Sequence, residues 1–337
     1  MTGSLDLDEN RSSLLEGALE GGAAVTEPAE FRHAIRYVLG WEDQQGRRSS
    51  QRGKRVRPAL CLAICELVGG RIEDALPAAV AVEFIHNFSL VHDEIQDQDS
   101  ERHGKPTAWK RFGSAQAINV GDALYSIGTG SLSEGSAPPE LRLRCAGILS
   151  AAVGAMVTGQ WRDLSFERQQ SISEADYFAM VTGKTGALMG AAAEMGAVLG
   201  GADPSSSAAL AQWARRIGVA FQVQDDYLGI WGDPDVTGKS NTGDIARRKK
   251  SLPIVFALSD ASSREIILAE YARPQDQEPD ASAVLGALAS CGAEVRTRET
   301  ADRWADDAEK ELREVGFDAT VCEHLASIGA TLAHRRR

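Results

Sequence analysis

The chain has 337 residues, of which 43% are hydrophobic and 25% charged, so it is long enough to bury a large core and falls within the range of globular proteins. Its formal net charge of −12 argues against nucleic acid as a partner. Apolar stretches are interrupted by Glu, Arg or Gly every few positions, and the first ten residues lack the basic and then apolar pattern of a secretory signal. We therefore expect a cytoplasmic protein without a membrane span.

Taken in chain order, residues 1–28 are rich in Ser, Glu and Gly and predict a flexible N-terminal tail. From residue 29 to residue 337, apolar residues recur at spacings of three and four, and the alternation typical of strands is nearly absent. The helical pattern is clearest in seven segments: 58–69, 77–97, 115–131, 140–163, 173–199, 207–230 and 293–313. The sequence predicts a single all-α domain over 29–337.

Two of the segments between these helices, 45–57 and 232–250, are long and combine Gly with many Lys and Arg residues. Long loops in a compact domain often carry function. Their composition is typical of loops that bind anions.

The first acidic motif is NFSLVHDEIQDQD, residues 87–99, at the end of an apolar helical stretch. Asp93 and Asp97 are four residues apart, so on a helix they lie one above the other on a single face. Like charges at this spacing repel each other, and the repulsion grows when the groups are partly buried. A hard cation between the carboxylates would remove it.

The second acidic motif is FQVQDDYLGIWGD, residues 221–233, which also ends a long apolar stretch. Asp225 and Asp226 are adjacent, and Asp233 follows the predicted helix end. A helix C-terminus carries partial negative charge, so carboxylates placed there favour cation binding. Because the ligands are all oxygen, with neither His nor Cys at metal-ligand spacing, they favour Mg²⁺ over zinc.

Either motif alone would be read as a solvated helix end, because acidic pairs on helices are common. Two such clusters in one chain, each preceded by a stretch apolar enough to be buried, favour metal binding instead. A negatively charged substrate is consistent with this arrangement only if the cation lies between it and the carboxylates.

The chain resembles the trans-prenyl diphosphate synthases, the polyprenyl synthetase family, and in particular its geranylgeranyl diphosphate synthase-like members. Ordered blocks from about residue 30 onward carry the resemblance: GKRVRP (53–58), EFIHNFSLVHDEIQD (83–97), RHGKPT (102–107), GKTGAL (183–188), and FQVQDDYLGIWGD followed by TGKSNTGD and KKSLP (221–253). It implies the isoprenoid synthase fold, a single bundle of long antiparallel helices around a deep central cavity. It also implies Mg²⁺-dependent condensation of an allylic diphosphate with isopentenyl diphosphate.

The resemblance implies roles for individual residues. Asp93, Asp97 and Asp225 match the positions that hold Mg²⁺, three ions in all. Three basic residues match positions that grip the allylic diphosphate: Arg102, Lys184 and Lys239. Thr185 and Gln222 match catalytic positions whose dipoles face the allylic cation, and Lys184 is also assigned to the catalytic set. The isopentenyl diphosphate pocket corresponds to Lys54, Arg57, His86 and His103.

The sequence departs from the family pattern at two informative positions. Glu94 replaces the second Asp of the first motif, and its extra methylene would displace an oxygen if that position were a direct Mg²⁺ ligand. His103 stands where most members have an arginine that binds isopentenyl diphosphate. A neutral imidazole has one donor where a guanidinium has five and a fixed charge, so we expect weaker binding of this substrate.

Phe88 and Ser89 lie five and four positions before Asp93, where the resemblance places the residues that limit product length. One aromatic ring beside a small residue resembles the geranylgeranyl pattern, which predicts a C20 product. The same Phe could simply be a core residue.

Two other functions remain open at this stage. Glu94 and His103 are compatible with a relative that ionises a prenyl diphosphate without condensation, as a terpene cyclase or diphosphate lyase does. The chain is also compatible with a non-catalytic partner subunit of a hetero-oligomeric synthase. The family resemblance implies a homodimer.

Overall fold

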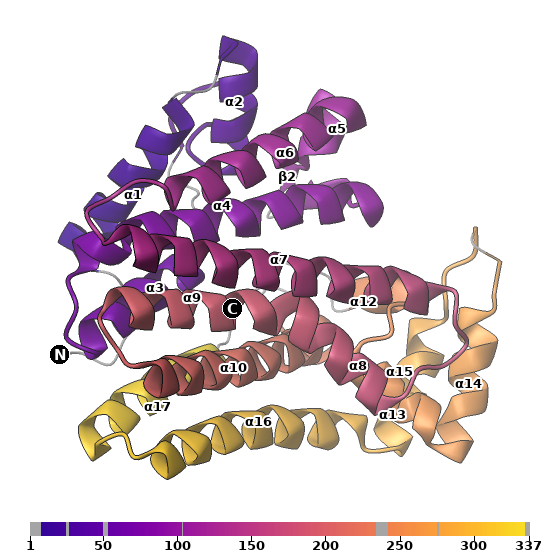
Figure 1. The fold of residues 1–337 in the computed structure, drawn as a ribbon. Coiled ribbons are helices and arrows are strands. Elements are labelled where there is room, and N and C mark those ends of the chain that lie inside the picture. Colours follow the sequence, from indigo (N-terminus) through magenta and orange to yellow (C-terminus); the bar gives the residue numbers. More distant parts are fainter. Residues whose placement is uncertain are drawn as a thin grey trace. The chain divides into compact units, whose positions relative to one another are not determined.

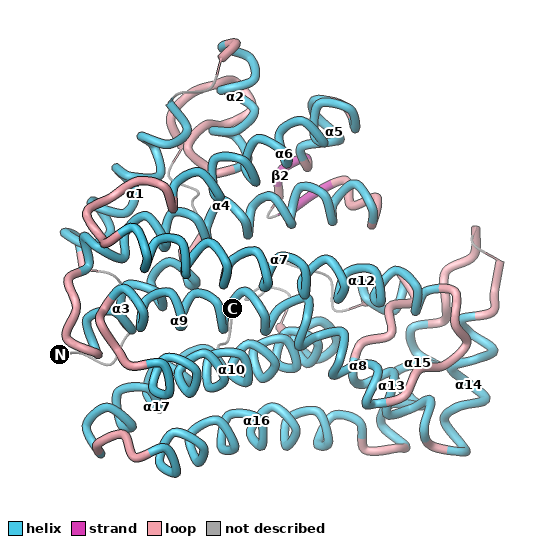
Figure 2. The backbone as a smooth tube through the Cα atoms, viewed as in Figure 1, coloured by secondary structure: helices cyan, strands magenta, loops and turns pink. Residues whose placement is uncertain are grey.

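The computed structural model describes residues 8–24, 27–49, 53–102, 104–233, 242–274 and 276–333, and Figures 1 and 2 show that these form helices with one short strand pair. The all-α prediction is confirmed for this part of the chain. The described residues group into two compact units, considered in turn below. We call residues 4–153 and 188–211 the N-terminal unit, and residues 154–187 and 212–337 the C-terminal unit.

Helix α4 (Ile72–Gln96) forms the buried centre of the N-terminal unit and packs against α3 (Val56–Leu67) and α6 (Ser114–Ser131). Glycines in α6 allow the close approach: a Cβ atom at Gly128 would lie 3.1 Å from the carbonyl oxygen of Ala81. A short antiparallel hairpin, β1 (Glu101–Arg102) with β2 (Lys105–Pro106), follows α4 and leads into α5 (Ala108–Phe112). The hairpin therefore starts directly after the first acidic motif.

Residues 9–24 differ from the predicted flexible tail, because they form helix α1 (Glu9–Ala24) in the N-terminal unit. Leu15, Leu19 and Ala23 have no exposed surface, and α1 packs against α4 and α2 (Ala29–Val38). The three glycines of this segment weaken its intrinsic helix propensity. Contacts with the rest of the unit, which local sequence cannot reveal, supply the missing stability.

Helix α13 (Leu252–Ser259) is the centre of the C-terminal unit, with every side chain from Leu252 to Leu258 buried. It packs against α8 (Glu174–Val181), α14 (Ala261–Tyr271), α15 (Ala281–Ser290) and α16 (Ala293–Val315). The remaining elements of this unit are the π-helical turn η1 (Thr182–Gly186), α12 (Gly243–Ala246) and α17 (Ala319–Ala333). Such a mainly apolar centre needs cover on several sides, which the surrounding helices provide.

Three helices contain or adjoin the boundaries between the units: α7 (Pro139–Glu167), α9 (Ala187–Leu199) and α10 (Pro204–Trp231). By length and composition, two described helices, α4 and α7, are apolar enough to cross a membrane. Their many Ala residues and few charges give the required mean hydropathy without the uninterrupted apolar run that we looked for in the sequence. The most apolar window of α4 is 61% buried inside the protein, as in a core helix, and that of α7 is 28% buried. The absence of a membrane span stays a prediction.

Candidate active site

The two outer carboxylates of the first motif lie at the C-terminal end of α4. Asp93 is in the last turn and half-buried, whereas Asp97 is the C-cap residue and exposed. The Asp97 N–H donates a hydrogen bond of 2.8 Å to the Asp93 carbonyl oxygen, which keeps the two residues one turn apart. This is the spacing that the sequence predicts for a pair of oxygen ligands.

Glu94 points elsewhere, because each residue of a helix is rotated by about 100° from its neighbour. Its side chain is buried, with Oε1 3.9 Å from Nε of Arg102. Burial raises the pKa of Glu94 to about 7, although the Arg102 charge and a hydrogen bond from the Ala108 N–H oppose the rise. Glu94 is thus buried and contacts the segment that follows the motif, whereas Asp93 is half-buried and Asp97 is exposed.

Three predicted substrate residues of the N-terminal unit interact electrostatically with one another. Burial, and then the charges of Arg57 and Arg102, lower the pKa of His86 well below its usual value, so the imidazole is neutral at pH 7. Burial also lowers the pKa of Arg57 to about 10, a shift that Glu83 opposes and Arg102 reinforces. Arg57 therefore remains protonated at neutral pH.

Arg57 has one donor that no described residue satisfies. Within the described part of the chain, Nε of Arg57 is buried and has no hydrogen-bond partner. A buried donor left unpaired is costly unless a ligand satisfies it. Lys54 lies three residues before Arg57 and is exposed, while His103 lies outside the described residues. This arrangement favours an anionic ligand.

The two residues that the sequence assigns to product length lie on α4. The Phe88 ring is half-buried and makes edge contacts with His92, at 4.8 Å between ring centroids, and with Tyr125 of α6, at 5.4 Å. The Ser89 hydroxyl donates to the carbonyl oxygen of His86 on its own helix, at 2.8 Å. Phe88 is therefore fixed by neighbouring rings, and Ser89 contributes little volume.

A pocket in the C-terminal unit is lined by the residues predicted to be catalytic and by several residues that the sequence did not single out. Its polar lining includes Asp163, Tyr177, Lys184, Thr185, Gln222, Asp226 and Lys249. Thr185 is on the π-helical turn, Gln222 and Asp226 are on α10, and Tyr177 is on α8. The pocket is therefore built from α7, which carries Asp163, from α8, η1 and α10, and from the loop before α13.

A chain of hydrogen bonds fixes the Thr185 and Gln222 side chains. The Thr185 hydroxyl donates to Oε1 of Gln222 at 3.0 Å, and Nε2 of Gln222 donates to Oδ1 of Asp226 at 3.1 Å. The other Asp226 oxygen accepts from the Tyr177 hydroxyl at 2.7 Å and from the Leu252 N–H at 2.9 Å. Asp226 thereby sets which way the Gln222 amide points.

Asp226 is buried, and burial raises its pKa, while Lys249, the Leu252 N–H and the Tyr177 hydroxyl oppose the rise. The adjacent Asp225 is half-buried. The sequence could not distinguish the two aspartates by type, but the structure assigns Asp226 to the interior. This leaves Asp225 as the motif's first carboxylate for a metal, as the resemblance implies.

The cations of the pocket are balanced by nearby acids. Nζ of Lys184 lies 2.6 Å from Oδ2 of Asp163. Burial alone would lower the pKa of Lys249, but Asp244, Asp226 and Asp163 outweigh it and raise the pKa. Lys249 is therefore held charged beside the pocket, and Lys184 forms an ion pair there with Asp163. Lys239, the third predicted cation, lies outside the described residues.

The donors present fit Mg²⁺, although the described residues contain no group of three or more candidate ligands. Mg²⁺ commonly takes one or two carboxylates and completes its shell with water and substrate phosphates. Asp93 with Asp97 in one unit and Asp225 in the other meet this requirement as oxygen donors.

Sequence reasoning missed Asp163, Tyr177, Asp226 and Lys249 as contributors to the pocket. Lys249 is part of the KKSLP block and Asp226 of the second motif, so each was visible as part of a motif without a role. Asp163 and Tyr177 are single residues in helices and have no local pattern that indicates their contacts.

Comparison with known proteins gives a consistent set of likenesses. The sequence model for polyprenyl synthetases matches residues 45–288. A (2E,6E)-farnesyl diphosphate synthase of Mycobacterium tuberculosis (strain ATCC 25618 / H37Rv) is 39% identical over 268 residues, which are 78% of this chain and 74% of the relative. A geranylgeranyl diphosphate synthase of Methanosarcina mazei is 34% identical over 308 residues, 91% of each chain.

Among solved structures, that of a polyprenyl synthetase from Streptomyces coelicolor A3(2) has a TM-score of 0.86 and 35% identity. The likeness covers 95% of this chain and 96% of that one. It confirms the all-α isoprenoid synthase fold that the sequence motifs imply.

Proposed function

This chain belongs to the polyprenyl synthetase family, and from that premise we propose that it is a trans-prenyl diphosphate synthase that condenses an allylic diphosphate with isopentenyl diphosphate. The observation that carries the proposal is the group of Arg57, Arg102 and neutral His86, in which the buried Nε of Arg57 has no hydrogen-bond partner among the described residues, beside the end of the helix that bears Asp93 and Asp97. A buried guanidinium nitrogen that lacks a hydrogen-bond partner is suited to bind an anion.

In the proposed reaction, the bond between C1 of the allylic substrate and its diphosphate breaks, and the double bond of isopentenyl diphosphate attacks C1. A proton then leaves the new chain as its double bond re-forms. Arg102, Lys184 and Lys239 would hold the departing diphosphate. Thr185 and Gln222, fixed in orientation by Asp226, would direct their oxygen dipoles at the developing allylic cation.

Enzymes of this family depend on Mg²⁺. We propose three ions, held by Asp93, Asp97 and Asp225 together with the substrate's phosphate oxygens. When bound, Mg²⁺ would withdraw charge from the leaving diphosphate, which is Lewis-acid assistance to ionisation. Glu94, buried against Arg102, would orient that arginine, and its extra methylene would not disturb the metal shell.

We propose geranylgeranyl diphosphate, C20, as the main product. Phe88 is fixed between His92 and Tyr125, so its ring can act as a firm stop, whereas Ser89 leaves space. The named relatives include both farnesyl and geranylgeranyl synthases, so the family alone does not decide the length. Mass spectrometry of products made from C5, C10 and C15 allylic substrates tests the proposal. A dominant C15 or C30 product would contradict it.

We also propose a cytoplasmic homodimer. Large apolar side chains in the N-terminal unit, Ile118 and Tyr125 on α6 and Leu143 on α7, are 45%, 38% and 75% exposed, respectively. Exposed apolar groups of this size are typical of surfaces that a partner covers. Light scattering on purified protein at micromolar concentration tests the oligomeric state.

The central experiment incubates the protein with Mg²⁺ and geranylgeranyl diphosphate, with and without isopentenyl diphosphate and shorter allylic substrates, followed by mass spectrometry. Chain elongation is the expected result. A hydrocarbon or alcohol formed without isopentenyl diphosphate would indicate a cyclase or lyase instead. No product in any incubation would indicate a non-catalytic partner subunit.

A further inference from the structure

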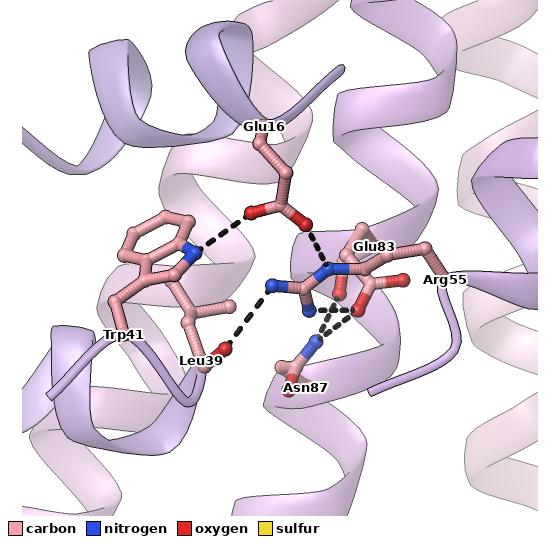
Figure 3. Close-up of polar contacts among 6 residues, drawn as sticks. All are labelled: Glu16, Leu39, Trp41, Arg55, Glu83 and Asn87. Atoms are coloured by element: carbon pink, nitrogen blue, oxygen red, sulfur yellow. Dashed lines mark hydrogen bonds and ion pairs between the residues drawn. The ribbon is translucent and has the colours of Figure 1, made fainter. Parts of the chain in front are cut away.

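Arg55, between the two predicted substrate residues Lys54 and Arg57, does not face a substrate site. Its side chain is buried, and all three guanidinium nitrogens are used (Figure 3). Nε donates to Glu16 at 2.9 Å, Nη1 to Glu83 at 2.7 Å, and Nη2 to the Leu39 carbonyl oxygen at 3.1 Å. The basic run Lys54 to Arg57 therefore has one cation directed into the protein interior.

The two acids around Arg55 are themselves held in place. The second oxygen of Glu16 accepts from Nε1 of Trp41 at 2.8 Å, and Glu83 accepts from Nδ2 of Asn87 at 2.9 Å. Figure 3 shows Glu16, Glu83 and Leu39 around one guanidinium, with Trp41 and Asn87 bonded to the two acids. Because each guanidinium nitrogen of Arg55 has a partner and both acids accept from a second donor, Arg55 has a well-defined position.

The backbone at Arg55 shows why this position matters. Arg55 has φ 50° and ψ 38°, a left-handed conformation that residues other than Gly adopt rarely. It is the N-cap of α3, and Arg57 follows in the first turn of that helix. The side-chain contacts of Arg55 hold a conformation that the backbone alone disfavours. They therefore set the chain direction on both sides, toward Lys54 and toward Arg57.

Glu16 comes from helix α1, which precedes the residues that match the family model. Its partner Glu83 is in α4, three residues before His86. One ion-pair group thus joins α1, the start of α3 and the helix that carries His86.

We propose that helix α1 is a positioning element of the isopentenyl diphosphate site and that Glu16, through Arg55, orients Lys54 and the first turn of α3, which bears Arg57. The proposal rests on the proposed function, because it assigns these two residues to that substrate. It predicts that a residue outside the family match controls the affinity for one of the two substrates.

The test replaces Glu16 and measures steady-state kinetics for each substrate. Glu16→Ala is expected to raise the KM for isopentenyl diphosphate about 10-fold, a loss within the range of one charge-assisted contact. Glu16→Gln keeps one acceptor oxygen, so an intermediate rise of about threefold is expected. The KM for the allylic substrate and kcat should change less than about twofold in both variants.

Two variants serve as controls. Glu20→Ala removes a carboxylate one turn further along α1. Glu66→Ala removes a different ion pair of this helix, in which Nη2 of Arg11 lies 2.7 Å from Oε1 of Glu66. Both should leave the KM for isopentenyl diphosphate within about twofold of the wild-type value. An equal rise in either control, or a joint rise of both KM values, would overturn the proposal, because the effect would then be general loosening of α1.

Two further measurements do not depend on turnover. Hydrogen exchange of amides in 53–59 should be faster in Glu16→Gln than in the wild type, and unchanged in Glu20→Ala. Titration with isopentenyl diphosphate in the absence of Mg²⁺ should give a Kd about threefold higher for Glu16→Gln. If the wild type binds isopentenyl diphosphate without elongating any substrate, the proposed synthase activity fails and the positioning proposal stands. Unchanged exchange and unchanged Kd in Glu16→Gln would refute the positioning role even if the enzyme is active.

Discussion

The two units of this protein carry similar acidic motifs in different surroundings. In the N-terminal unit, the motif's middle acid Glu94 is buried against Arg102, and the nearby Arg57 has a buried nitrogen without a hydrogen-bond partner among the described residues. In the C-terminal unit, Asp226 is fully hydrogen-bonded and Lys184 is paired with Asp163. The first unit therefore gains most from binding an anion, whereas the second has its polar groups arranged beforehand.

This contrast predicts a division between substitutions that affect substrate binding and those that affect folding. Substitutions of groups in the N-terminal unit that are not fully hydrogen-bonded should alter kinetics and leave stability unchanged. Changes in the hydrogen-bonded groups of the C-terminal unit should alter stability as well.

The largest effect is expected for Asp93→Asn. Loss of a carboxylate that would hold metal against the leaving group should lower kcat about 10²- to 10³-fold, a magnitude typical of removing one electrostatic contact to a transition state. The melting temperature should stay the same or rise slightly, because a negative charge at a helix C-terminus is unfavourable. Asp122→Asn, an exposed carboxylate on α6, is the control and should change kcat less than about twofold.

The neighbours Asp225 and Asp226 give the next comparison. Asp226→Asn should lower the free energy of unfolding by about 2–3 kcal/mol, because an amide cannot accept from Tyr177, Leu252 and Gln222 together. Asp225→Asn should reduce kcat strongly and leave stability nearly unchanged. Urea unfolding and initial rates measure both variants. Equal stability of the two would contradict the structural assignment of Asp226.

Arg57→Gln should raise the KM for isopentenyl diphosphate about 10- to 100-fold, equivalent to roughly 1.5–3 kcal/mol for a charge-assisted contact. Its stability should not fall, because a buried nitrogen without a hydrogen-bond partner is removed. The exposed loop residue Arg47, changed to Gln, is the matched control. A similar rise in the KM for the allylic substrate would show that the effect of Arg57 is not specific to isopentenyl diphosphate.

His103→Arg tests the departure from the family pattern in the opposite direction. The guanidinium would supply the donors and fixed charge that most members have there, so the KM for isopentenyl diphosphate should fall up to about 10-fold. Steady-state kinetics at saturating allylic substrate measure the effect. An unchanged or higher KM would mean that this position does not contact the substrate.

The smallest effect concerns pH and His86. Its pKa is lowered in the folded protein by burial and by neighbouring arginines, so the unfolded chain takes up the proton first as pH falls. Stability should be fully present above pH 6.5 and decrease below it, by about 1 kcal/mol between pH 7 and pH 5.5. Urea unfolding of His86→Gln should lose this part of the pH dependence. His324→Gln, on α17, should retain it.

Much of the fold could be predicted from the sequence, because apolar residues at spacings of three and four identify long helices directly. Helix α1 could not be, since its stability comes from Leu15, Leu19 and the Glu16–Arg55 ion pair. Local composition, with three glycines and many polar residues, indicates a tail. Helix α1 differs from the predicted tail because contacts between residues far apart in the chain stabilise it.

In the candidate site, residue type and spacing predicted metal binding by the acidic motifs and the family resemblance predicted the cations, but neither could give the direction of each side chain. Glu94 and Asp226 are carboxylates within acidic motifs, and both are buried in the structure. Their roles depend on Arg102, Ala108, Tyr177 and Leu252, which lie outside the motifs' own helical spacing. The sequence therefore identified the motifs, but it did not predict the contacts that each residue within them makes.

The π-helical turn η1 makes the segment with Lys184 and Thr185 particularly sensitive to its number of residues. Such a turn holds more residues than an α-helical turn of the same extent, so Lys184 and Thr185 depend on one extra residue for their orientation. Deleting Gly183 could restore a regular helix, and it would rotate the side chains on one side of the deletion by about 100° relative to those on the other. The amino-acid types of the site would all be retained, but the lysine and threonine would no longer share the pocket with Gln222. In this segment, the number of residues therefore matters as much as their identity.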